Sequence, residues 1–335
     1  MTNLSRRGFN GLAATAALTL CAPRLARADG KTVNIAIQYG FGYLPIMVAS
    51  DLGLFGKHAV LKGEKDATFA ITRLSGSPAS IDALLGGRVD LCALGLPAAL
   101  ILFDKTRASM KVKVLASVTC TPYSLYTNNP AIKSIADFGP DDRIAVTAGN
   151  SPQAILLRIA AGKQLGNVDA FNTRMISLPH PDAVVALTAG KTIAGYFSTP
   201  PFSGFLAKDP QVHKILTSTD ILGSSPTGAV LAAKGDFVQA NPAIADAIVA
   251  ALDEADAIIA SDPRKAAEIY LKQESSKLTL DEVEALVRDP VEVFSVAPNA
   301  VMAFADFLYS QGDIKAPLAK WQDAFFPNIA DRKGS

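Results

Sequence analysis

Short apolar runs of β type alternate along this chain with longer stretches of helical periodicity, and this alternation constrains the fold more than any other feature. The run at 33–38 is followed by a helical stretch at 44–52, and the run at 68–74 by another at 77–85. Such alternation is typical of a parallel sheet covered by helices. The sequence therefore predicts an α/β fold.

The alternating pattern starts a second time near residue 120. A first series ends with a strand expected at 112–118, and a second series begins with a strand expected at 123–127. Beyond 233 the chain is mostly helical, and helices without a sheet of their own need a surface to pack on. We therefore expect two α/β lobes: 29–120 with 226–335 as a discontinuous lobe 1, and 121–225 as lobe 2. Two chain crossings, near Cys120 and Thr227, form the expected hinge.

Residues 1–28 differ from the rest of the chain and predict an export signal of the twin-arginine type. Arg6 and Arg7 precede an apolar stretch at 12–20, and the stretch 26–28 (ARA) has the small residues of a signal-peptidase site. The apolar stretch is too short for a membrane anchor, which needs ~20 residues. Lipidation of Cys21 is an alternative, although Leu20 is bulky for that motif. A periplasmic location follows from this interpretation.

Composition excludes several classes of function. Lys and Arg number 32 against 31 for Asp and Glu, and a phosphate-backbone binder needs a net basic face, so nucleic acid is not an expected partner. The three His residues are isolated, and no Cys or His cluster has metal-ligand spacing, so we expect neither metal nor cofactor. Cys92 and Cys120 lie in predicted strands as buried thiols, or as a disulfide that spacing alone does not establish.

Four stretches carry a family resemblance, and they occur in the order that the family uses: 43–49 (YLPIMVA), 53–58 (GLFGKH), 83–91 (ALLGGRVDL) and 134–138 (SIADF). The sequence resembles the nitrate, sulfonate and taurine-type periplasmic binding proteins, a family similar to the pyrimidine-precursor binders. The resemblance implies a type II periplasmic-binding-protein fold that closes on a solute and delivers it, as a monomer, to an ABC permease in the inner membrane. The polar stretch 62–66 departs from the family pattern.

Candidate binding residues lie where predicted strands lead into helices, because ligands of open α/β sheets bind at these ends of the strands. Small residues at helix starts let backbone N–H groups approach a ligand, and the helix dipole favours a sulfonate or carboxylate. The candidates after the first three strands are Gln38, Tyr39, Phe41, Tyr43, Ser75, Gly76, Ser77, Gly95 and Leu96; those in the second lobe are Asn150, Ser151, Gln153 and His180.

Several of these candidates have a structural alternative. Ser77 and Ser151 are also plausible N-caps, with a proline directly after each. The aromatic residues after the first strand include at least one that we expect in the core, and His180 is also a plausible helix cap. Thr119 and Thr121 lie at the expected hinge, where a structural role is favoured over contact with a solute.

The sequence favours a binding protein over an enzyme, with no catalytic residue. A desulfinase on the same fold uses a nucleophilic Cys with His and Arg, but Cys92 lies in an apolar run without a basic neighbour to lower its pKa. The sequence has no phosphate loop, nucleophile elbow or dinucleotide fingerprint. We therefore expect an importer component that captures a small organic anion, such as a sulfonate or a taurine-like solute. A sensory binding module is a further alternative.

Overall fold

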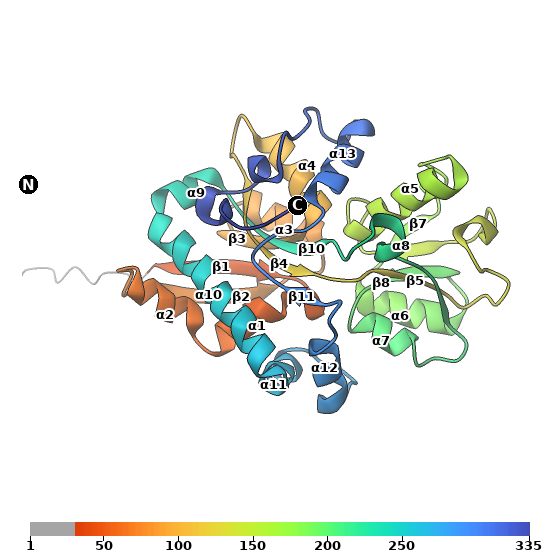
Figure 1. The fold of residues 1–335 in the computed structure, drawn as a ribbon, viewed down its shortest axis with the longest axis horizontal. Helices are drawn as coiled ribbons and strands as arrows, with labels where there is room; N and C mark the ends of the chain where they lie inside the picture. The colour runs from red at the N-terminus through yellow and green to blue at the C-terminus, as the bar shows by residue number, and fades with distance from the viewer. Residues whose placement is uncertain (1–30) are drawn as a thin grey trace, which may run out of the picture.

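The structure is a computed structural model that describes residues 31–335, so the predicted signal segment and Cys21 lie outside the described residues. Two separate β-sheets, each flanked by helices, lie side by side (Figure 1). We use lobe 1 for 31–120 with 226–335, and lobe 2 for 121–225. Within the described part of the chain, no single helix is long and apolar enough to cross a membrane.

Lobe 1 contains a six-stranded sheet whose strand order is β11-β4-β10-β3-β1-β2. Its strands are β1 (Thr32–Ile37), β2 (Thr68–Arg73), β3 (Leu91–Gly95), β4 (Lys113–Cys120), β10 (Thr227–Ala233) and β11 (Val293–Phe294). Strands β1, β2 and β3 pair in parallel, as the alternating pattern predicts. Every residue of β3 and of β10 is buried, which explains why these runs are continuously apolar.

The central strand and one edge strand of this sheet run antiparallel to their neighbours. Strand β10 lies between β3 and β4 and is antiparallel to both, and β11 is antiparallel to β4. The physical reason is the second crossing, which brings the chain back from lobe 2 and into the sheet from the opposite end. The sheet of lobe 1 is therefore mixed.

Lobe 2 contains a five-stranded mixed sheet of order β7-β6-β8-β5-β9. Its strands are β5 (Ser124–Thr127), β6 (Ile144–Val146), β7 (Met175–Ser177), β8 (Gly195–Ser198) and β9 (His213–Thr217), and its helices are α5 (Pro152–Leu165), α6 (His180–Ala189), α7 (Phe202–Leu206) and α8 (Ser218–Leu222). Strand β9, which the sequence pattern did not predict, pairs with β5 along one edge of the sheet.

The helical C-terminal part covers lobe 1, as expected. The helices of this lobe are α1 (Leu44–Asp51), α2 (Leu54–Leu61), α3 (Ser77–Leu85), α4 (Leu96–Thr106), α9 (Gly235–Ala240), α10 (Pro242–Ser261), α11 (Pro263–Gln273), α12 (Leu280–Val287) and α13 (Val301–Ser310). The long helix α10 packs on α1 and α2, whereas α13 packs on α4 (Figure 1). The polar stretch 62–66 forms an exposed turn between α2 and β2.

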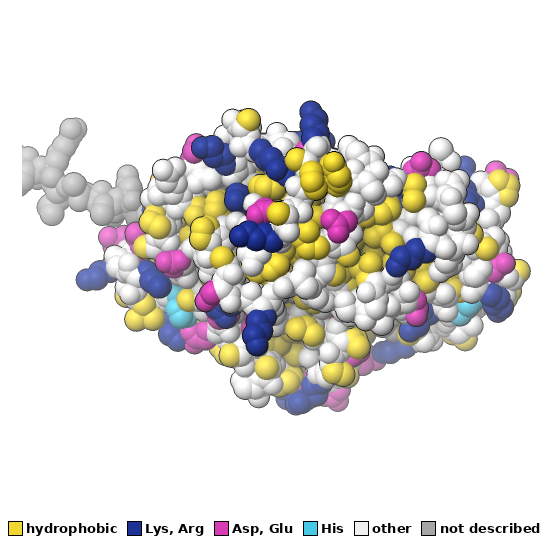
Figure 2. Space-filling view, turned by 45° about the horizontal axis from the view of Figure 1, so that its top comes forward, with side chains coloured by type: hydrophobic (Ala, Val, Ile, Leu, Met, Phe, Trp, Pro, Cys, Tyr) yellow, Lys and Arg dark blue, Asp and Glu magenta, His cyan; other side chains and the backbone are white. Residues whose placement is uncertain are grey.

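Two crossings join the lobes, one between β4 and β5 and the other between α8 and β10. They are hydrogen-bonded to each other, because the backbone N–H of Thr121 donates to the carbonyl of Pro226 over 3.1 Å. Further contacts hold the lobes together, since Arg158 of α5 forms an ion pair of 2.9 Å with Asp313 of lobe 1. On the face shown in Figure 2 the lobes meet without an open gap, and acidic and basic side chains are dispersed over it. The two lobes are therefore in direct contact in this structure.

Candidate functional site

A small cavity of about 50 Å³ lies between the lobes, next to the hinge. Residues from both sheets surround it. Its lining consists of Gln38, Tyr39, Gly40, Gly42, Tyr43, Ser77, Gly95, Thr119, Thr121, Tyr123, Thr147, Pro152, Gln153, His180, Thr199, Gly228 and Ala229. The cavity is therefore rich in hydroxyl and amide groups, and we call it the interlobe cavity.

The ends of three lobe 1 strands are linked to each other at the cavity wall. The side-chain amide of Gln38, which follows β1, donates to the carbonyl of Ala93 over 2.9 Å and to the Ser77 hydroxyl over 3.3 Å. The Ser77 hydroxyl also accepts from the backbone N–H of Gly95 over 3.4 Å. These bonds fix Gln38 and Ser77 in place before any solute arrives.

Four helices begin at the cavity, two from each lobe. Ser77 is the first residue of α3 and Gly95 is the N-cap of α4; Pro152 begins α5 and His180 begins α6. The N-terminus of a helix carries a partial positive charge and unpaired N–H groups. Among the described residues that line the cavity, none is Lys, Arg, Asp or Glu. The helix ends therefore supply the positive potential of the site.

On the lobe 2 side, the wall is formed by a buried amide and a buried imidazole. Gln153 is only 2% exposed, and its amide oxygen accepts from the Thr147 hydroxyl over 3.3 Å. The Nε2 atom of His180 lies 3.4 Å from the Gln153 amide nitrogen, and its Nδ1 contacts the Tyr196 hydroxyl. Burial lowers the pKa of His180 to about 4, so the imidazole is neutral at pH 7.

A buried carboxyl group lies behind the hinge side of the cavity. Glu292 accepts hydrogen bonds from the hydroxyls of Thr119 and Thr121, over 3.2 and 2.9 Å, and the Thr121 hydroxyl also lies 3.1 Å from that of Thr199 in lobe 2. Burial raises the pKa of Glu292 to about 8, although the two threonine hydroxyls oppose the shift. The carboxyl group is therefore mostly protonated at pH 7 and places little negative charge near the cavity.

Seven of the residues predicted from the sequence meet at the cavity: Gln38, Tyr39, Tyr43, Ser77, Gly95, Gln153 and His180. Thr119 and Thr121, for which a structural role was favoured, also line it. The sequence analysis missed Glu292. This residue directly precedes β11, and nothing in its local sequence indicates that the pairing of β11 with β4 brings it to the hinge.

The other candidates do not line the cavity. The side chain of Phe41 is fully buried in the core against Tyr270 and Phe294, and Leu96 is also fully buried. Asn150 lines a different pocket, whose other lining residues come from α3, α4 and the turn after α4. Ser75 and Gly76 lie in the loop before α3 but outside the lining.

The two serine caps have different outcomes. Ser151 caps α5, since its hydroxyl accepts from the backbone N–H of Ala154 over 3.3 Å, and it does not line the cavity. The prediction of Ser77 as an N-cap is wrong, because Gly76 is the N-cap and Ser77 is already helical. Its hydroxyl is instead used by Gln38 and Gly95. The structural interpretation thus applies to Ser151 and not to Ser77.

Cys92 and Cys120 are both buried and free, so the disulfide alternative is absent from the described structure. Burial raises the pKa of the Cys92 thiol far above its usual range, and it also raises that of Cys120. Neither lines the interlobe cavity. Within residues 31–335, no group of three or more His, Cys, Asp or Glu side chains is placed to hold a metal ion.

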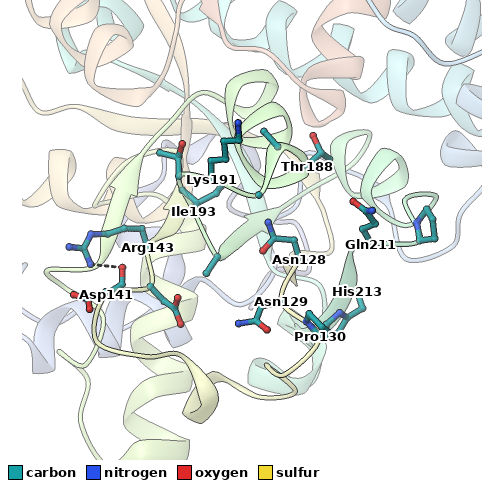
Figure 3. Close-up of a pocket in the computed structure, with 16 residues that line it drawn as sticks. Asn128, Asn129, Pro130, Asp141, Arg143, Thr188, Lys191, Ile193, Gln211 and His213 are labelled. Atoms are coloured by element: carbon teal, nitrogen blue, oxygen red, sulfur yellow. Dashed lines mark hydrogen bonds between the residues drawn. The ribbon is translucent and has the colours of Figure 1, made fainter.

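A larger, more open pocket of about 850 Å³ lies at the far end of lobe 2 (Figure 3). It is lined by polar residues that follow β5, precede β6 and β8, or begin β9, among them Asn128, Arg143, Lys191 and His213. These strand ends are opposite to those at the interlobe cavity. Because lobe 1 contributes nothing to this pocket, closure of the lobes does not enclose a molecule there.

The two lobes around an enclosed polar cavity have the periplasmic-binding-protein fold. The chain belongs to the NMT1-like family, whose model matches residues 27–271. Among curated relatives, binding proteins of Brucella abortus and Brucella suis are 26% identical over 94% of this chain and 96% of their own length.

Solved structures of the same fold include three binding proteins. The periplasmic aliphatic sulphonate binding protein of Escherichia coli is 19% identical, with a TM-score of 0.65 over 88% of this chain and 98% of that one. The alkanesulfonate-binding protein of Xanthomonas axonopodis pv. citri is 17% identical, with a TM-score of 0.69 over 88% of this chain and 98% of that one. The periplasmic nitrate-binding protein of Synechocystis is 16% identical, with a TM-score of 0.66 over 85% of this chain and 83% of that one.

Proposed function

We propose that this protein is the periplasmic solute-binding component of an ABC importer and that it captures a small organic anion in the interlobe cavity. It then presents the closed form to a permease in the inner membrane, acting as a monomer and reaching the periplasm by the twin-arginine route. The names of the sulfonate- and nitrate-binding neighbours support this role, since both solutes are anions.

The observation that carries the proposal is the convergence of four helix N-termini, two from each lobe, on one cavity. An anion held there interacts with both lobes at once, so it favours the closed form over the open one. Because His180 is neutral and Glu292 is protonated at pH 7, nothing in the wall opposes a negative charge. Binding without a basic side chain is consistent with a site that must also release its solute.

The same geometry supports binding without chemistry. The desulfinase alternative requires a reactive thiolate at the cavity, whereas the Cys92 thiol is buried, protonated and outside the lining.

Isothermal titration calorimetry with ethanesulfonate, taurine, nitrate and acetate tests the proposal. Gln153→Leu removes a buried amide from the wall, and the loss of one hydrogen bond to a charged group weakens binding by roughly 10- to 150-fold. The matched control is Gln164→Leu, an exposed position on the same helix, which should bind like the wild type. Mass spectrometry of the incubated solutes checks for turnover. Absence of saturable binding by all four probes, or conversion of any of them, contradicts the proposal.

A further inference from the structure

A chain of three hydrogen-bonded side chains crosses the hinge from lobe 1 to lobe 2. It starts at the Glu292 carboxyl group, whose Oε2 atom lies 2.9 Å from the hydroxyl of Thr121 in the first crossing. The Thr121 hydroxyl lies 3.1 Å from the hydroxyl of Thr199, which directly follows β8 in lobe 2. All three residues are buried, so bulk water does not interrupt the chain. We call these three residues the hinge chain.

The hinge chain ends at the interlobe cavity. Thr121 and Thr199 line the cavity, whereas Glu292 lies behind them. Among the described residues, the Thr199 hydroxyl has Thr121 as its only hydrogen-bond partner. Its remaining capacity for hydrogen bonding is therefore available to a molecule in the cavity.

The direction of the hydrogen bonds along the hinge chain depends on one proton. A hydroxyl group has a single proton to donate, so Thr121 donates either to Glu292 or to Thr199. If the carboxyl group is ionised, Thr121 donates to it, Thr199 donates to Thr121, and the cavity faces only oxygen lone pairs of Thr199. If the carboxyl group is protonated at Oε2, Glu292 donates to Thr121 and Thr121 donates to Thr199. The Thr199 proton is then available to a molecule in the cavity.

The geometry favours the Thr121 side of the carboxyl group as the site of the proton. The Oε2 atom lies 2.9 Å from the Thr121 hydroxyl, whereas Oε1 lies 3.2 Å from the Thr119 hydroxyl. The shorter contact is closer to the ordinary distance of an O–H···O hydrogen bond. Thr119 can still donate to the unprotonated Oε1 atom, or to the carbonyl of Val293 over 3.3 Å. Both threonine hydroxyls therefore keep their partners when Glu292 is protonated.

The surroundings of Glu292 keep the proton on it at pH 7. Burial is the largest cause that raises the pKa of Glu292 to about 8, and the negative charge of Asp289 adds to this shift. Cys120 on β4 and Tyr123 after the crossing are the other titratable groups near it, and burial raises the pKa of both above the ordinary values. No Lys or Arg of the described residues is among the groups that shift the pKa of Glu292.

We propose that Glu292 is a positioning residue for anion binding: its protonated carboxyl group donates to Thr121, and the hinge chain thereby presents the Thr199 hydroxyl to the solute as a hydrogen-bond donor. This proposal rests on the proposed function and adds to it a residue that does not itself touch the solute. A solute anion selects the protonated form. Its capture is therefore coupled to the uptake of a proton from water wherever Glu292 is partly ionised.

The test measures affinity by calorimetry at pH 7, 8 and 9 with ethanesulfonate, nitrate and acetate, whose charges do not change over this range. The protonated fraction of Glu292 falls from about nine-tenths at pH 7 to about one-tenth at pH 9, so the wild-type affinity should fall about tenfold. At pH 8, titrations in two amine buffers of different ionisation enthalpy should show uptake of about half a proton per bound anion. Glu292→Gln keeps a donor toward Thr121, so it should show neither the fall nor the uptake.

Thr199→Val separates the hinge chain from simple charge repulsion. Valine has the shape of threonine without the hydroxyl, and the contacts of Glu292 with Thr119 and Thr121 stay in place, so Glu292 still titrates. Affinity at pH 7 should fall by roughly tenfold or more, as for one lost hydrogen bond to a charged group, and the further fall from pH 7 to 9 should shrink to less than about threefold. The matched control is Thr147→Val, which removes a cavity hydroxyl outside the hinge chain and should retain the full fall with pH.

The possible failures are distinguishable. A fall with pH of equal size in the wild type and in Thr199→Val, loss of the fall in Thr147→Val as well, or a wild-type affinity that does not change from pH 7 to 9 overturns the role of Glu292 and leaves the proposed function standing. These comparisons decide the question even if Glu292→Gln does not fold, because none of them uses that variant. Absence of saturable binding of all three probes to the wild type at pH 7 overturns the proposed function, and the role of Glu292 with it.

Discussion

Gly95 lies where the two lobes touch, and its substitution provides a direct test of closure. A Cβ atom added to Gly95 would lie 2.6 Å from Cδ of Pro152 in lobe 2 and 3.1 Å from Cγ. Real Cβ atoms essentially never approach another atom within 3.0 Å, so the closed form must shift. The backbone of Gly95 has φ −64° and ψ 141°, which any residue adopts, so alanine is not strained when the lobes are apart.

The expected magnitude follows from the overlap. Inserting a methyl group into a well-packed contact costs about 1–3 kcal/mol. Since only the closed form carries this cost, Gly95→Ala should weaken solute binding by roughly 5- to 150-fold. Stability toward urea should not fall, because replacing glycine at a compatible backbone conformation stabilises by about 0.4–1 kcal/mol through the unfolded state.

Two measurements check this prediction. Calorimetry gives the affinity for the tightest probe, and small-angle X-ray scattering of the probe-saturated protein gives the radius of gyration. The matched control is Gly149→Ala, since Gly149 has no atom within 4 Å of an added Cβ and no positive φ. Wild-type affinity together with a wild-type radius of gyration for Gly95→Ala would refute the reasoning, because the contact with Pro152 would then not limit closure.

Three further predictions concern Glu292 and Ser151. As the pH rises through about 8, Glu292 ionises behind the cavity and repels an anion. Affinity measured from pH 7 to 9 should therefore fall in the wild type and stay level in Glu292→Gln. A parallel fall in both proteins would exclude Glu292 as the cause. The unfolded carboxyl group ionises near 4.5, so folding stability attributable to Glu292 falls between pH 4.5 and 8, and the Gln variant should lack that fall. Ser151→Ala should lower the free energy of unfolding in urea by about 1 kcal/mol, because the α5 cap is lost. The affinity for the solute should change less than twofold, and a larger change in affinity would place Ser151 in contact with the solute.

Local sequence signals predicted the elements that position the site. The proline after Ser77 and the Ser151-Pro152 pair marked the starts of α3 and α5, and the apolar runs before them marked the strands. Because the ends of these strands face the same cleft, Gln38 and Gln153 line one cavity, and their contact with a solute stays a prediction.

Other features depended on contacts between distant segments and had no local signal. At least one of Tyr39, Phe41 and Tyr43 was expected in the core, but the sequence does not indicate which one; the short 3₁₀ turn at Phe41–Tyr43 directs Phe41 there. The position of Glu292 depends on the pairing of β11 with β4, which joins residues about 170 positions apart in the chain. Periodicity cannot distinguish a parallel from an antiparallel central strand, so the sequence left the direction of β10 open.

The central place of β10 has a consequence for the newly made chain. While a ribosome has delivered only the first 226 residues, β3 and β4 have no strand to join them, although every strand of the second sheet is already present. The nascent chain can therefore complete the sheet of lobe 2 first, whereas the sheet of lobe 1 stays incomplete until β10 emerges from the ribosome. A holding chaperone would have its greatest value during that interval, when two apolar strand edges are exposed.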